Sequence, residues 1–145
     1  MVRAGAACRR SGQASLKIQP IVLVLDDDPA VLSALKDSLE SNSRFQLLVA
    51  QSYSVASEII MLSPVDVIVA DVLLAGAATG IDLCYEAMKR YPKVALVLIS
   101  ADVESNFQSY PVRAVCLHKP FGASDLLDAI AKARVAVALL LPQSG

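Results

Sequence analysis

Five short apolar runs, separated by helix-like stretches, constrain the fold of this chain more than any other feature. Each run is almost continuously apolar, which is typical of strands buried on both faces of a parallel sheet. Aromatic residues make up only 5% of the chain, so aliphatic side chains must build the core. The runs that we predict to be strands are Ile21–Leu25, Phe45–Ala50, Val65–Ala70, Val94–Ile99 and Ala114–Leu117.

The stretches between the runs carry helix signals. Asp28 is suited to an N-cap and Pro29 to a first helical turn, where a missing amide donor costs nothing. Strands that alternate with helices predict an α/β fold with right-handed crossovers and a doubly wound sheet. The predicted helices begin at Pro29, cover Ser54–Met61, Ile81–Arg90 and Val103–Ser109, and begin again near Ser124.

The last of these helices has two distinct faces. Its predicted outer side carries Val135 and Leu139, which indicates a contact surface. The side that we expect to pack inward carries Leu126, Ile130, Ala133 and Val137.

The length of 145 residues fits one domain. We expect a flexible tail over residues 1–18, a folded domain over 19–141 and a short tail over 142–145. The net charge of −1 gives no support for direct nucleic-acid binding. No apolar run approaches the roughly 18 residues of a membrane-spanning helix, and the N-terminus is too weakly apolar for a signal peptide.

The three cysteines are odd in number and show no metal-ligand spacing. This pattern argues against a zinc site and against a disulfide framework. Reduced thiols in a cytoplasmic protein are the simplest interpretation.

Every predicted strand end around the expected crevice carries a polar or charged group. In doubly wound sheets the crevice lies at the carboxyl ends of the strands. Taken singly, each of these groups could be a turn, a cap or a solvated surface residue, but together they suggest a site. The groups are Asp26, Asp27 and Asp28 after the first strand, Asp71 after the third, Ser100 after the fourth, and His118 and Lys119 after the fifth.

The chemistry of these groups is that of a phosphoryl site. Converging carboxylates raise one another's pKa unless a cation neutralises them, and Mg2+ suits a few carboxylates together with water and phosphate oxygens. Asp71 could act as a nucleophile and form an aspartyl phosphate. Lys119 would pair with a phosphoryl oxygen as charge develops, and Ser100 offers a hydroxyl to another.

At this point the sequence resembles the CheY-like receiver domains of two-component response regulators, over about residues 20 to 140. That family has a flavodoxin-like sheet of five parallel strands in the order 2-1-3-4-5, with five helices. The matching stretches are VLVLDDDP at 22–29, VDVIVAD at 65–71, LISA at 98–101 and HKPF at 118–121.

The resemblance implies a role for each polar residue. Asp71 matches the phosphoacceptor, Lys119 the lysine that pairs with the phosphoryl group, and Ser100 the switch hydroxyl. The bond between Lys119 and Pro120 would be cis. The implied protein ligands of Mg2+ are Asp26 through water, Asp27 directly, Asp71, and the backbone carbonyl of Leu73.

The resemblance also implies partners. A sensor histidine kinase or a histidine phosphotransfer protein would donate the phosphoryl group, and an unknown downstream protein would read the result. A homodimer would use the face made by Val103–Ser109, the last strand and the last helix. No output domain follows in this sequence, so we expect a stand-alone, cytoplasmic module.

Three departures from the family pattern affect output more than chemistry. Cys116 stands where the family commonly has an aromatic switch residue, and a buried small side chain is its simplest interpretation. The stretch between Ser100 and Lys119 is short, and the loop after Asp71 is long. The departures at Cys116 and in the short stretch motivate one alternative, a receiver-fold scaffold that signals without phosphorylation, although all the active-site roles remain occupied.

Two other classes fit the sequence less well. A phosphatase of the haloacid-dehalogenase type would need a second acid two residues after its nucleophile, but Leu73 occupies that position after Asp71. A flavodoxin-like electron carrier would need a phosphate-binding loop after the first strand, and none is present there.

Overall fold

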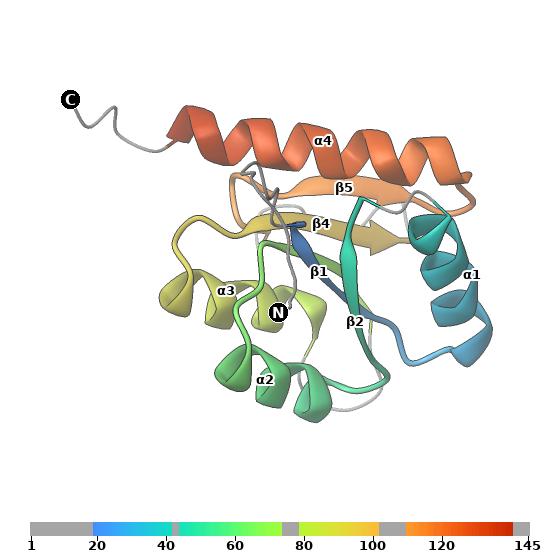
Figure 1. Ribbon diagram of the computed structural model, residues 1–145, viewed down its shortest axis with the longest axis horizontal. Helices are drawn as coiled ribbons and strands as arrows, with labels where there is room; N and C mark the ends of the chain where they lie inside the picture. The colour runs from blue at the N-terminus through green and yellow to red at the C-terminus, as the bar shows by residue number, and fades with distance from the viewer. Residues whose placement is uncertain (1–18, 42–43, 74–78, 102–109, 141–145) are drawn as a thin grey trace, which may run out of the picture.

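A single five-stranded parallel sheet organises the molecule, in the order β2-β1-β3-β4-β5 (Figure 1). The computed structural model describes residues 19–41, 44–73, 79–101 and 110–140. This order and the parallel pairing confirm the predicted fold class. The strands are β1 Ile21–Leu25, β2 Gln46–Ala50, β3 Val67–Asp71, β4 Ala95–Ser100 and β5 Val115–His118.

Helices cover both faces of the sheet. Those in the described ranges are α1 Pro29–Glu40, α2 Tyr53–Leu62, α3 Gly80–Arg90 and α4 Ala123–Leu140. α1 and α4 pack on one face, and α2 and α3 pack on the other. The predicted helix Val103–Ser109 and both predicted tails lie outside the described residues.

The core therefore consists of two apolar layers, one on each side of the sheet. Alternate strand residues feed alternate layers: Val22 and Val24 of β1 face α1 and α4, whereas Leu23 and Leu25 face α2 and α3. Both sets are fully buried. The runs are continuously apolar because helices cover both faces of each strand, so that neither face is exposed to water and needs polar residues.

Short-range caps fix where the helices begin. The Asp28 carboxylate accepts a hydrogen bond from the Ala30 amide at 2.9 Å, and Pro29 opens α1. At α3, Thr79 and Asp82 form a reciprocal capping box. These caps occupy amide donors that the first helical turn otherwise leaves without a partner.

Three strands extend one residue beyond their predicted carboxyl ends, to Asp71, Ser100 and His118. The backbone ladder continues through these polar residues, since Asp71 pairs with Ile99 and Ser100 pairs with His118. Apolarity marks the buried part of a strand, whereas hydrogen bonding continues to its end. These longer strands place the three side chains on the sheet itself and not on the loops that follow.

The two faces of α4 are as predicted. All four residues expected to pack inward are buried, whereas Val135 and Leu139 are 57% and 79% exposed. In the described part of the chain, no helix combines the length and apolarity needed to cross a membrane.

Candidate functional site

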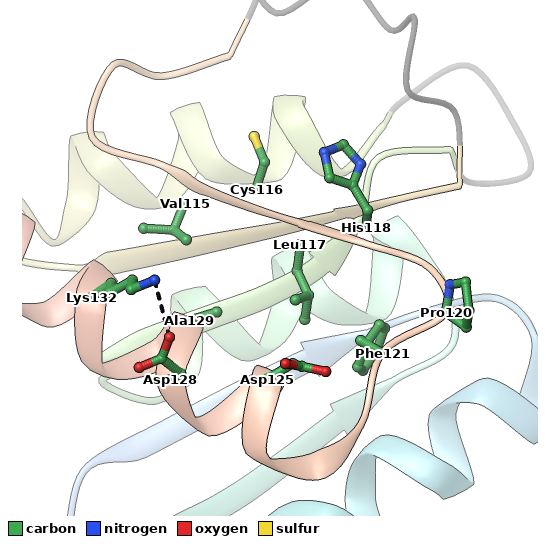
Figure 2. Close-up of a pocket in the computed structure, with 10 residues that line it drawn as sticks. All are labelled: Val115, Cys116, Leu117, His118, Pro120, Phe121, Asp125, Asp128, Ala129 and Lys132. Carbon is green, nitrogen blue, oxygen red and sulfur yellow. Dashed lines mark ion pairs between the residues drawn. The ribbon is translucent and has the colours of Figure 1, made fainter.

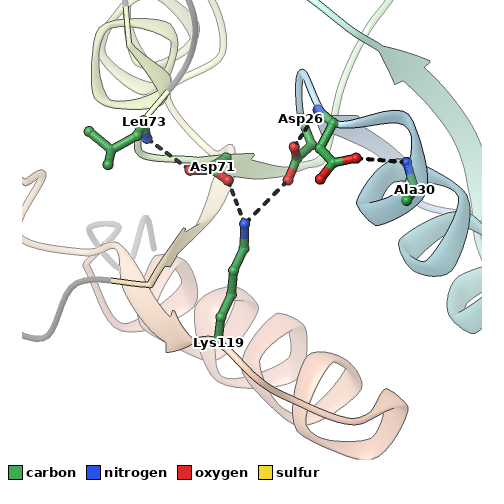
Figure 3. A network of polar contacts seen from close by, with 6 residues as sticks. Asp26, Ala30, Asp71, Leu73 and Lys119 are labelled. Carbon is green, nitrogen blue, oxygen red and sulfur yellow. Dashed lines mark hydrogen bonds and ion pairs between the residues drawn. The ribbon is translucent and has the colours of Figure 1, made fainter.

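Three charged side chains meet at the carboxyl edge of the sheet. The Lys119 Nζ lies 2.8 Å from Asp71 Oδ2 and 3.8 Å from Asp26 Oδ2. Figure 3 shows the lysine side chain extending from the segment after β5 toward both carboxylates. Asp71 ends β3, Asp26 directly follows β1, and Lys119 directly follows β5. Because parallel strands end at the same edge, residues far apart in the sequence meet here.

Backbone amides hold one oxygen of each carboxylate. Asp26 Oδ1 accepts from the Asp28 amide at 2.9 Å, and Asp71 Oδ1 accepts from the Leu73 amide at 2.8 Å. The Leu73 amide thus holds one oxygen of Asp71, and the Lys119 ammonium contacts the other, Oδ2. The nucleophile candidate has a fixed orientation before any substrate arrives.

The Asp26 carboxyl is in an unfavourable environment for its charge. It is 1% exposed, and its Oδ2 has no hydrogen-bond partner among the described residues. Burial and the nearby Asp71 charge raise the pKa of Asp26 to about 6. Burial alone would lower the pKa of Lys119, but its hydrogen bond to Asp71 and the surrounding acids outweigh this and raise it. The site thus carries more negative charge than one ammonium neutralises.

This donor set fits a hard divalent cation. In the described ranges, no group of three or more His, Cys, Asp or Glu side chains is arranged as a cage that could hold a metal ion. Mg2+ needs no such cage, since it binds proteins through one or two carboxylates and keeps several waters. The buried Asp26 Oδ2 without a hydrogen-bond partner is the kind of oxygen that a cation would satisfy. Asp27 is exposed beside it, and Leu73 lies next to Asp71 through the amide contact above.

Ser100 ends β4, the strand that pairs with β3 and β5. It is buried, and its carbonyl accepts from the Lys119 amide at 3.0 Å. Ser100 and Lys119 are therefore tied through the backbone. The peptide bond between Lys119 and Pro120 is cis, as expected.

Cys116 and His118 project to the same side of β5, opposite to Val115 and Leu117 (Figure 2). Cys116 is half-buried against the core layer of α2 and α3, and burial raises the pKa of its thiol. A reactive thiolate is therefore disfavoured here. His118 is exposed.

Gly80 is a further residue at the site, and the sequence offers little to reveal it beyond its position after Thr79, a capping residue type. It opens α3 directly above β3, and its amide donates to the Val72 carbonyl at 3.4 Å.

Comparison with known families agrees with this geometry. Residues 22–131 match the family described as the response regulator receiver domain. The chain belongs to the response-regulator receiver family. No curated protein matches the chain.

Solved receivers share the fold at low sequence identity. A response regulator receiver protein from Sinorhizobium medicae WSM419 is 21% identical, with a TM-score of 0.75, over 82% of this chain and 97% of that one. A receiver domain protein from Clostridium thermocellum is 25% identical, with a TM-score of 0.69, over 84% and 99%. The chemotaxis protein CheY4 from Vibrio cholerae is 18% identical, with a TM-score of 0.71, over 80% and 99%. The receiver fold therefore accounts for almost all of the described part of this chain.

Proposed function

We propose that this receiver accepts a phosphoryl group on Asp71, with Mg2+ bound beside it, from a histidine kinase or a histidine phosphotransfer protein. The observation that carries the proposal is the convergence of Asp26, Asp71 and Lys119 at one sheet edge. The family membership supports it, because a receiver domain is the phosphoacceptor partner in two-component signalling.

The proposed transfer is a simple exchange at phosphorus. A carboxylate oxygen of Asp71 forms a bond to phosphorus, and the bond between phosphorus and the donor's imidazole nitrogen breaks. The Leu73 amide orients the carboxylate through Oδ1. The Lys119 ammonium, now on Oδ2, would move to a phosphoryl oxygen as charge develops there. Its charge is already within reach, so little rearrangement is needed.

The Mg2+ ligands in this proposal are Asp26, Asp27, Asp71 and the Leu73 backbone carbonyl. The ion would neutralise the carboxylates and the incoming phosphoryl oxygens, which otherwise repel each other. Burial first and the nearby Asp71 charge second raise the pKa of Asp26 to about 6, and a bound cation would favour the ionised carboxylate against both.

Output would follow from the phosphoryl group through Ser100. Its backbone contact with Lys119 gives a connection from the site to β4 and β5. The surface that changes would include β5 and α4, where Val135 and Leu139 are exposed for a downstream protein or for a second copy. The cytoplasm is the proposed location, and the free thiols of Cys84 and Cys116 suit its reducing conditions.

One observation favours an alternative function, a receiver-fold scaffold that signals without phosphorylation. Cys116 is small and already packed against the core, so it cannot swing inward as an aromatic side chain would. The chemistry at Asp71 does not depend on this position, and we therefore rank the scaffold second.

The test is the intact mass of the protein after incubation with acetyl phosphate and Mg2+. The proposal predicts a gain of one phosphoryl group, which disappears when EDTA is added and in the Asp71→Asn variant. No gain with either acetyl phosphate or phosphoramidate would contradict it and would favour the scaffold.

A further inference from the structure

Gly80 is the first residue of α3, and it lies against the backbone of the proposed phosphoacceptor. A β-carbon at this position would overlap the Asp71 carbonyl oxygen, well inside van der Waals distance. It would also lie 3.0 Å from the Asp71 carbonyl carbon and 3.2 Å from the Ala70 β-carbon. The first atom that such a group meets is thus main chain, which cannot swing away as a side chain can. Only glycine allows α3 to begin this close to Asp71.

The helix has little freedom to retreat from the overlap. On its inner side Leu83, Cys84 and Ala87 are fully buried in the core. Farther along, Glu86 binds α2 through two hydrogen bonds, one from Tyr53 at 2.5 Å and one from Ser57 at 2.6 Å. Close-packed interiors transmit strain. A side chain at position 80 would therefore press on the Asp71 peptide as well as on the helix.

The Asp71 carboxylate depends on that peptide for its position. Its two oxygens are held at 2.8 Å each, by the Leu73 amide and by Lys119. A shift of the Asp71 carbonyl tilts the bond from Cα to Cβ and so moves the carboxylate away from these contacts. A misplacement of about 1 Å can cost roughly a hundredfold in rate.

We infer that Gly80 is a positioning residue for phosphoryl transfer: its missing β-carbon sets the position of the Asp71 peptide and hence of the carboxylate. The inference rests on the proposed function of Asp71 and adds to it a residue that never touches the phosphoryl group.

The experiment compares Gly80→Ala with Gly122→Ala. Gly122 also stands at the start of a helix, directly before α4, but within the described ranges a β-carbon there would meet the Asp125 carboxylate alone, at an ordinary 3.7 Å. Both substitutions reduce the freedom of the unfolded chain alike, so the control isolates the overlap with Asp71. Each variant and the wild type receive two measurements, the rate of phosphorylation by acetyl phosphate with saturating Mg2+ and the hydrogen-exchange rate of the Leu73 amide without Mg2+.

We expect Gly80→Ala to lower the phosphorylation rate of the folded protein at least tenfold and to speed exchange of the Leu73 amide at least fivefold. Gly122→Ala should stay within twofold of the wild type in both. A Gly80→Ala protein that matches the control in either measurement overturns the inference, because the carboxylate has then kept its position or its position does not matter.

Two further outcomes are also decisive. If Gly80→Ala unfolds, all three proteins are measured in an excluded osmolyte, which favours the compact state; a variant that stays unfolded even there shows that Gly80 serves the fold alone and overturns the inference. If the wild type takes up no phosphoryl group, the proposed function fails, while exchange at Leu73 still decides whether Gly80 positions Asp71.

Discussion

The two edges of the sheet use polar side chains in opposite ways. At the amino edge, polar groups hold neighbouring segments together. Asp66 accepts a hydrogen bond from the Ile21 amide at 2.8 Å. The Tyr91 hydroxyl lies within hydrogen-bond distance of the carbonyls of Ile60 and Ser63. Arg113 donates a hydrogen bond to the Pro92 carbonyl. These contacts join backbone to side chain and serve the fold.

At the carboxyl edge, charged groups crowd one another. Asp26 and Asp71 share a single nearby ammonium, and one Asp26 oxygen has no hydrogen-bond partner among the described residues. An arrangement of this kind weakens the metal-free fold, and a bound cation and phosphoryl group would relieve it. Two buried nitrogens of Arg113 at the amino edge also have no hydrogen-bond partner among the described residues, so the edges differ in the crowding of acidic charge and not in how completely polar atoms are paired.

The largest expected effect concerns the lysine at the carboxyl edge. Lys119→Met keeps much of the side-chain stem and removes the ammonium that lies 2.8 Å from Asp71. We predict that phosphorylation by acetyl phosphate slows about a hundredfold, because a preorganised charge at developing negative charge is worth roughly 2.7 kcal/mol or more.

The matched control is Lys132→Met. Among the described residues that lysine pairs with Asp128, one helical turn away on the exposed surface of α4, at 3.0 Å. Its loss should leave the rate within twofold. Equal rates for the two lysine variants would show that the ammonium at the carboxyl edge contributes nothing to transfer.

The next effect is on stability and its pH dependence. Between pH 3.8 and about 6 the folded state keeps a proton on Asp26 that the unfolded chain has released. Rising pH therefore favours unfolding over this window, by an amount on the order of 1–3 kcal/mol. Asp26→Asn removes the contribution, so without Mg2+ the variant should be more stable than the wild type at pH 7 and nearly equal to it at pH 4.

Urea unfolding in EDTA at both pH values measures this difference, and adding Mg2+ sharpens it. The ion should stabilise the wild type and stabilise the Asn variant much less. A stability difference that is the same at pH 4 and pH 7 would mean that Asp26 is not strained by its surroundings.

The smallest effect belongs to the amino edge. Tyr91→Phe leaves the Ile60 and Ser63 carbonyls without their hydroxyl donor, which should cost about 1–2 kcal/mol of unfolding free energy. The phosphorylation rate of the folded variant should remain within twofold of the wild type. A large loss of rate would mean that the amino edge also contributes to phosphoryl transfer.

The sequence predicts the sheet well because burial on both faces leaves a direct trace in composition. The run Ile21–Leu25 coincides with β1 to the residue, and the other four runs differ from their strands by one or two residues at an end. The strand ends were less accurate, because the backbone ladder of β3 and β4 continues through the polar Asp71 and Ser100. The pattern of apolar residues does not reveal that the backbone hydrogen bonds of the sheet continue through polar residues.

The site was predictable in outline for a related reason: parallel strands end at one edge, so Asp26, Asp71 and Lys119 had to lie near one another. Which oxygen the lysine holds was not predictable, since that depends on side-chain geometry. The close approach of Gly80 was missed too, because a glycine permits two main chains to come close without indicating which segment lies against it.

The most direct test of the central claim is to locate the phosphoryl group. After reaction with acetyl phosphate and Mg2+, borohydride reduces an aspartyl phosphate to homoserine, and peptide mass spectrometry then identifies the altered residue. We expect reduction at Asp71 and at no other aspartate. Reduction at another acid, or at none in a protein that has gained phosphoryl mass, would contradict the central claim.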